Sequence, residues 1–148
     1  MKTPQDNIDL IKRALTEDCP RTDVSADLCL SASSQSAAQI LAKEDGIFFG
    51  ESCCRDIIKI VDNSLNFKLL VTDGQSFKKG ETLLTLNGYT KSILKIERTL
   101  LNFLQHLCGI STITKQYVDT LNNSSIEILD TRKTHPTFRS YQKAAVKA

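Results

Sequence analysis

The sequence predicts an α+β amino-terminal domain, with helices on an antiparallel sheet, that leads into the first strand of a truncated α/β barrel. Short β-rich segments and one amphipathic helix alternate over residues 37–86, and turn residues separate them. From Lys91 onward, a long helical pattern precedes one β-rich run that ends in polar residues, an order typical of an α/β barrel. We place the first domain, with its long linking helix, at residues 1–111 and the incomplete barrel at 112–148.

The chain is expected to begin with a helix over residues 4–16. Pro4 suits the first position of a helix because its missing N–H group has no partner there anyway. Apolar side chains then recur at helical spacing, at Ile8, Ile11 and Leu15. Residues 17–36 contain five serines, a proline and several aspartates, which favour local hydrogen bonds over regular structure. We expect a loop there, with room for one short strand.

The next fifty residues predict the sheet. Asp45 and Gly46 are expected to form a tight turn between two strands, because such a pair accepts the positive φ that the turn needs. An amphipathic helix is expected over 51–62, with its apolar residues on one face. Strands are expected at residues 37–43, 47–49, 67–71 and 81–86.

A long helical pattern follows from Lys91 to Leu121. Its apolar and small residues recur at steps of three and four, and Gly109 leaves open whether they form one helix or two. A loop is expected over 122–125, and the β-rich run over 126–130 is the expected first barrel strand. The repeating positions of the helix are Ile93, Ile96, Leu100, Leu104, Leu107, Ser111, Thr114, Val118 and Leu121.

Composition excludes several classes of protein. Hydrophobic residues make up 41% and charged residues 24%, as in a globular domain, and the formal net charge of +2 gives no indication of a nucleic-acid partner. No apolar run approaches the ~20 residues that cross a bilayer, and none resembles a signal peptide. We therefore expect a cytoplasmic protein with no membrane partner. Five cysteines without metal-ligand spacing predict reduced thiols and no metal site.

The first candidate motif lies in the long helix, over residues 97–110. If Leu100, Leu104 and Leu107 face the core, Arg98 points away from it, because two residues correspond to about 200° of rotation. Asn102 and Gln105 follow it at helical spacing, so a polar stripe runs along the outer face. By itself, such a stripe is typical of a solvated helix face.

The second candidate motif follows the expected barrel strand. Arg132 and Lys133 stand in tandem between the hydroxyls of Thr131 and Thr134. A guanidinium and an ammonium at a strand end suit the carboxylate or phosphate oxygens of a doubly anionic ligand. The alternative is a basic surface loop without a ligand. The following residues are basic and almost free of acids, at His135, Arg139, Lys143 and Lys147.

Taken together, the two motifs resemble the quinolinate phosphoribosyltransferase family (nicotinate-nucleotide pyrophosphorylase, carboxylating). The first reads Glu-Arg-Thr-x-Leu-Asn-Phe-Leu-Gln-x-Leu-x-Gly-Ile, and roughly twenty residues later the second reads Leu-Asp-Thr-Arg-Lys-Thr-x-Pro. Weaker similarity extends over nearly the whole chain. Because the match is long, ordered and correctly spaced, it is far more specific than either motif alone.

The resemblance implies a glycosyltransferase of NAD biosynthesis, more narrowly a pentosyltransferase. It would transfer a phosphoribosyl group from phosphoribosyl pyrophosphate to quinolinate, releasing nicotinate mononucleotide, carbon dioxide and pyrophosphate. Arg132 and Lys133 would bind the anionic groups, and Thr131 and Thr134 would supply hydroxyls. Arg98 would reach the active site of the second subunit of a homodimer. The resemblance identifies no catalytic residue within this sequence, and the Mg²⁺ ligands are expected beyond its end.

Two alternatives remain open at this level. One is a related phosphoribosyltransferase-like protein of the same fold that acts on another pyridine acid. The other is a non-catalytic, dimerising remnant. In either case we expect the 148 residues alone to be inactive, because a complete barrel takes ~250 residues.

Overall fold

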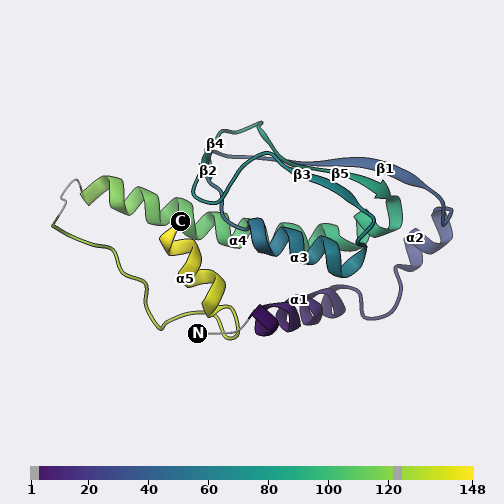
Figure 1. Ribbon diagram of the computed structural model, residues 1–148, viewed down its shortest axis with the longest axis horizontal. Helices are drawn as coiled ribbons and strands as arrows, with labels where there is room; N and C mark the ends of the chain where they lie inside the picture. The colour runs from purple at the N-terminus through teal and green to yellow at the C-terminus, as the bar shows by residue number, and fades with distance from the viewer. Residues whose placement is uncertain (1–3, 122–124) are drawn as a thin grey trace.

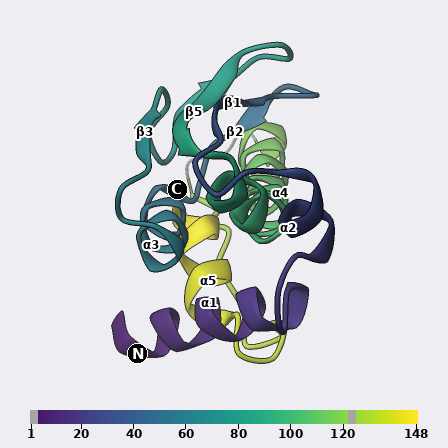
Figure 2. The same cartoon turned by 90° about the vertical axis from the view of Figure 1, so that its right-hand side faces the viewer.

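The computed structural model describes residues 4–121 and 125–148, whose main layers are a sheet, a middle pair of helices and an outer pair (Figures 1 and 2). The sheet lies on one side of α3 and α4, whereas α1 and α5 lie on the other. In chain order the elements are α1 (Pro4–Asp18), α2 (Val24–Cys29), β1 (Gln35–Leu41), β2 (Gly46–Ile47), α3 (Glu51–Val61), β3 (Asn66–Leu69), β4 (Ser76–Phe77), β5 (Thr82–Tyr89), α4 (Thr90–Leu121) and α5 (Arg139–Lys147).

The main sheet has the order β1-β5-β3, and both pairings are antiparallel. Strand β5 is central, so Leu86 lies opposite Ala38 on one side and opposite Phe67 on the other. Leu84 and Leu86 are buried against the helices, as the alternation of a half-buried strand requires. The predicted antiparallel sheet with helices on it is confirmed.

The predicted turn at Asp45 and Gly46 is wrong. Strand β2 does not pair with β1 but forms a separate two-stranded sheet with β4, where Gly46 lies opposite Phe77. Asp45 directs the chain there, because its carboxylate accepts the backbone N–H of Lys79 at 2.9 Å and the ammonium of Lys78 at 2.8 Å. Gly46 allows the Phe77 ring to pack directly against the backbone, since a Cβ atom there would lie 2.7 Å from a ring carbon of Phe77.

Helix α2 was not predicted, because its residues fall in the expected loop over 17–36. Asp23 is its N-cap, and its carboxylate accepts the backbone N–H of Ala26 at 3.0 Å. Ala26 is buried and attaches this short helix to the rest of the fold. The aspartate that suggested a loop therefore begins a helix.

The core lies where α3 and α4 meet under the sheet. Leu100, Leu104 and Leu107 are all buried, which confirms the predicted inner face of α4. The helix continues without interruption past Gly109, so one helix spans the predicted domain boundary at residue 111, and that boundary stays a prediction. Although α4 is 32 residues long, no helix among the described residues has the length and apolar character needed to span a bilayer.

Helix α3 begins at a glycine that fits the core closely. Gly50 has a φ of 144°, and a Cβ atom there would lie 2.8 Å from a methyl group of Leu104. Since Gly50 has no side chain to cap the helix, Asp73 accepts the N–H groups of Gly50 and Glu51 at 2.8 and 3.0 Å. The loop before β4 thereby caps a helix more than twenty residues earlier in the chain.

The expected barrel strand over 126–130 is not formed. Among the described residues, no ladder of backbone hydrogen bonds joins this segment to another strand, and Ile126 and Leu129 are exposed. A parallel barrel strand needs neighbours on both sides, so this segment alone does not satisfy the pattern. The predicted loop at 122–125 lies outside the described residues except for Ser125.

Helix α5 returns the chain to α4. Tyr141 and Ala145 are buried, and the ring of Phe138 lies 4.9 Å from that of Phe103 on α4. The Ser111 hydroxyl of α4 donates to the carbonyl of Ala145 at 2.7 Å. The end of the basic loop that precedes α5 is thereby held close to the side of α4 that carries Phe103 and Ser111.

Candidate substrate-binding site

The second motif lies at a surface hollow of about 890 Å³ between the loop, α5 and the start of α1. Of the predicted residues, Arg132 and Thr134 line it, whereas Thr131 and Lys133 are exposed beside them in sequence and do not. The hollow is also lined by four further basic residues and one carboxylate, at His135, Arg139, Lys143, Lys147 and Asp6.

The loop is shaped by its own side chains and by α5. The Thr131 hydroxyl accepts the backbone N–H of Lys133 at 2.9 Å. Arg139 donates to the Thr134 hydroxyl at 3.0 Å and to the carbonyl of Arg132 at 3.3 Å. A residue outside the motif therefore fixes its backbone through a rigid planar guanidinium.

The cations of the site differ in what they already bind. Lys143 is ion-paired with Asp130, and Arg139 is engaged with the loop. Among the described residues, the side chains of Arg132 and Lys133 form no ion pair. Together with Lys147, which lines the hollow and also forms no ion pair among the described residues, these two are the groups whose charge is available to an external anion.

Sequence reasoning left Arg139 and Lys143 out of the predicted site. Both belong to the basic, acid-poor last stretch of the sequence. That stretch could have indicated that they belong to the anion-binding site. Their positions four residues apart place them on one side of α5. Helical spacing counted from Arg139 would have shown that they reach the same hollow.

Arg98 lies apart from this hollow and is not among the residues that line it. Its side chain is 74% exposed, which confirms the predicted outward direction, and its Nε atom is 3.0 Å from the Asp18 carboxylate at the end of α1. Exposed ion pairs contribute only about 0–1 kcal/mol, so another anion can replace Asp18 at little cost.

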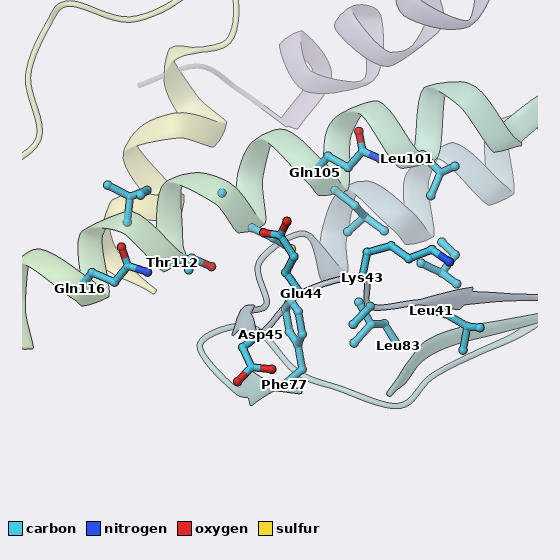
Figure 3. Close-up of a pocket in the computed structure, with 16 residues that line it drawn as sticks. Leu41, Lys43, Glu44, Asp45, Phe77, Leu83, Leu101, Gln105, Thr112 and Gln116 are labelled. Atoms are coloured by element: carbon cyan, nitrogen blue, oxygen red, sulfur yellow. The ribbon is translucent and has the colours of Figure 1, made fainter. Parts of the chain in front are cut away.

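A second pocket, of about 440 Å³, lies between α4 and the segment that joins β1 to β2. Figure 3 shows Gln105, Thr112 and Gln116 of α4 along it, with Lys43 and Glu44 across from them. Its lining is mostly apolar and includes Cys108, whose pKa burial raises to about 11, which leaves the thiol protonated and unreactive. None of the predicted site residues lines this pocket.

The described residues do not fit a magnesium ion. They contain no group of three or more histidine, cysteine, aspartate or glutamate side chains that could hold a metal. In the hollow, Asp6 is accompanied by several cations, whereas Mg²⁺ prefers carboxylate oxygens and water.

Two family models match the chain, and together they cover nearly all of residues 23–148. The model described as quinolinate phosphoribosyl transferase, N-terminal domain, matches residues 23–108, and the C-terminal domain model matches residues 110–148. The chain belongs to the quinolinate phosphoribosyltransferase family. The family inferred from the two motifs is therefore confirmed.

Named relatives and solved structures agree with this assignment. The probable nicotinate-nucleotide pyrophosphorylase of Bacillus subtilis is 39% identical over 75% of this chain, and quinolinate phosphoribosyltransferase 2b of Nicotiana tabacum is 37% identical over 93% of it. The crystal structure of NadC from Streptococcus pyogenes matches 99% of this chain with a TM-score of 0.93 and 34% identity. The chain spans 38% and 39% of the two relatives and 52% of that structure.

Proposed function

We propose that this chain supplies one wall of a quinolinate site at which a phosphoribosyl group is transferred from phosphoribosyl pyrophosphate. The products would be nicotinate mononucleotide, carbon dioxide and pyrophosphate. The observation that carries the proposal is the loop over residues 131–134, which presents Arg132 and Lys133 beside a hollow with basic walls, neither of them in an ion pair with another described residue. Quinolinate carries two carboxylates on adjacent ring positions, so it needs paired cations at short separation.

The geometry of each side chain suits it to a different group of the substrate. The planar guanidinium of Arg132 suits one carboxylate through two parallel hydrogen bonds, and the flexible ammonium of Lys133 suits a second anionic group. The Thr131 oxygen already accepts a backbone N–H, so its own hydrogen stays available to a ligand. Thr134 is oriented by Arg139 in the same way. Holding the pyridine ring in one place lowers the entropic barrier to transfer.

The proposal is tested by calorimetric titration of the 148-residue chain with quinolinate and with nicotinate, which has only one carboxylate. We expect Arg132→Ala to weaken quinolinate binding by roughly 10- to 100-fold, because a charge-assisted bond contributes about 1.5–3 kcal/mol. The matched control is Lys115→Ala, which removes an exposed cation paired with Asp119 on α4. Equal affinity for both acids, or an Arg132→Ala variant that binds normally, would contradict the proposal.

The proposal also gives Arg98 a role across a homodimer. Arg98 is exposed, lies on the outer face of α4 with Asn102 and Gln105, and among the described residues is held by one exchangeable ion pair, with Asp18. In a dimer, its guanidinium would exchange Asp18 for an anionic group bound in the partner's site. Sedimentation velocity should show a dimer, and Arg98→Ala should weaken substrate binding only in the dimer. A strictly monomeric chain that binds the substrate with full affinity would contradict this role of Arg98.

Magnesium and cellular location complete the proposal. We expect Mg²⁺ to bind the pyrophosphate through carboxylates that lie outside these 148 residues, because the described residues do not fit it. A cytoplasmic location stays a prediction. It does not follow from the family, since the named relatives include mitochondrial and chloroplastic proteins as well as bacterial ones.

A further inference from the structure

One buried amide joins the anion-binding loop to the long helix. Gln142 of α5 is 9% exposed, and its Nε2 atom lies 2.8 Å from Nε2 of His106 on α4 and 2.7 Å from Nδ1 of His135. His135 directly follows Thr134, so the contact is made at the end of the loop that carries Arg132 and Lys133. Neither of the two candidate motifs, read by itself, predicts this contact.

The orientation of the amide is fixed by a backbone group. The N–H group of His135 donates to Oε1 of Gln142 at 2.9 Å. If the amide were turned over, its NH₂ group would face this N–H, and two donors would oppose each other. The NH₂ group of Gln142 therefore faces the two imidazole rings and donates one hydrogen to each.

This geometry determines the protonation state of both rings. A ring nitrogen that accepts a hydrogen bond carries no proton, so His106 must hold its hydrogen on Nδ1 and His135 on Nε2. Protonation of either ring would replace an acceptor with an N–H group that faces the amide NH₂. The rings also contact each other, with centroids 5.2 Å apart, so two charged rings would repel.

We propose that Gln142 is a positioning residue, which holds the anion-binding loop on α4 by bonding His106 and His135 at once and only while both imidazoles are neutral. The role of the loop rests on the proposed function, whereas the contact itself does not. The amide connects three parts of the site: α5, the loop with Arg132, and the helix that also carries Arg98. In acid the loop would lose this attachment.

The surroundings oppose a positive charge on this trio. Desolvation, and then the neighbouring His135, lower the pKa of His106 below its ordinary value. From α3, Asp56 lies close enough to influence the neighbouring Tyr141, and Asp6 of α1 lines the hollow beside His135. These carboxylates are outnumbered by the cations that line the hollow, which are Arg132, Arg139, Lys143 and Lys147.

The test follows the imidazole nitrogens by ¹⁵N NMR in the 148-residue chain, together with amide exchange of the loop. We expect single neutral tautomers above pH 7, with the hydrogen on Nδ1 of His106 and on Nε2 of His135. Gln142→Leu should mix the tautomers and speed exchange of the amides at residues 133–135 by roughly tenfold, the loss of about 1.4 kcal/mol. Gln116→Leu, which changes an exposed glutamine of α4, should do neither.

A second variant separates positioning from a general effect on folding. Gln142→Glu keeps the acceptor for the His135 N–H but replaces the donor NH₂ with a carboxylate, which favours protonated rings. We expect His106 to titrate at higher pH than in the unmodified chain. His106 with its hydrogen on Nε2 in the unmodified chain, or unchanged titration in Gln142→Glu, would overturn the inference. If the ring signals agree but quinolinate does not bind, the proposed function fails and the positioning contact stands.

Discussion

Residues 35–121 and residues 125–148 are held together in different ways. The first region buries the facing sides of the sheet, α3 and α4 in one hydrophobic core, with Ile57, Ile96 and Leu107 fully enclosed. The second region contributes few buried apolar side chains, and its attachment to α4 combines the ring contact between Phe138 and Phe103 with directed hydrogen bonds from Ser111 and Gln142. The first should therefore tolerate loss of single polar contacts, whereas the second should not.

The largest effect is expected from a glycine in the first region. Gly50→Ala would place a Cβ atom 2.8 Å from a Leu104 methyl group, at a φ of 144° that side chains rarely adopt. We expect the free energy of unfolding to fall by about 2–4 kcal/mol, measured by urea denaturation.

Gly109→Ala is the matched control, because a Cβ atom there meets nothing within 4 Å and the residue lies inside α4. This change should stabilise the protein by about 0.5–1 kcal/mol through helix propensity. If Gly50→Ala proves as harmless as Gly109→Ala, the close packing of the first region is misjudged.

A smaller effect should be confined to the second region. The carbonyl of Ala145 lies in the last turn of α5, where helix carbonyls have no partner within the helix, and Ser111 supplies one. Ser111→Ala should cost about 1–2 kcal/mol and speed amide exchange in α5 more than in α3.

Thr120→Ala is the control, because that hydroxyl bonds a carbonyl of its own helix. It should leave both regions unchanged. Equal acceleration of exchange throughout the Ser111→Ala protein would show that the two regions unfold as one.

Replacement of Tyr141 is expected to raise the stability of the chain, whereas the changes at Gly50 and Ser111 lower it. Among the described residues, its hydroxyl is the one buried side-chain group without a hydrogen-bond partner, and burial raises its pKa above the ordinary tyrosine value. Tyr141→Phe should stabilise the attachment of α5 by up to about 1 kcal/mol, because an unsatisfied buried hydroxyl is costly. A clear loss of stability on thermal unfolding would mean that the hydroxyl has a partner after all.

The smallest effect should be a dependence of the free energy of unfolding on pH that arises from His106. Its pKa is lowered in the folded chain, so between the folded and unfolded values the unfolded chain binds more protons. This contribution to stability is therefore complete above about pH 6.5 and is lost as the pH falls below that value. His106→Phe should reduce the slope of unfolding free energy against pH in this window. An unchanged slope would assign the dependence to another group.

Sequence reasoning succeeded where a long periodic pattern determined the result. The buried face of α4, the exposure of Arg98 and the antiparallel sheet all follow from spacing. It failed where one side chain redirected the chain, as Asp23 does by capping α2 and Asp45 by bonding Lys79. Such contacts depend on tertiary placement, which spacing does not show.

In the site, too, the residues of a contiguous motif could be predicted, whereas contacts between distant residues could not. Arg132 and Thr134 were found because the motif is contiguous, and Arg139 was visible only as part of a basic stretch. The bond between Gln142 and His106 joins residues 36 positions apart, and nothing in either local sequence indicates it. The predicted strand over 126–130 failed for lack of neighbouring strands.

Hydrogen exchange with and without quinolinate tests the central claim most directly. We predict slow exchange in α3 and in α4 up to residue 107, and fast exchange over residues 126–132 in the free chain. Quinolinate should then slow exchange in the loop over 131–135 and at the facing turns of α5, and Arg132→Ala should abolish that protection. Protection that appears instead around the pocket between β1 and α4, or that persists in Arg132→Ala, would contradict the assignment of the site.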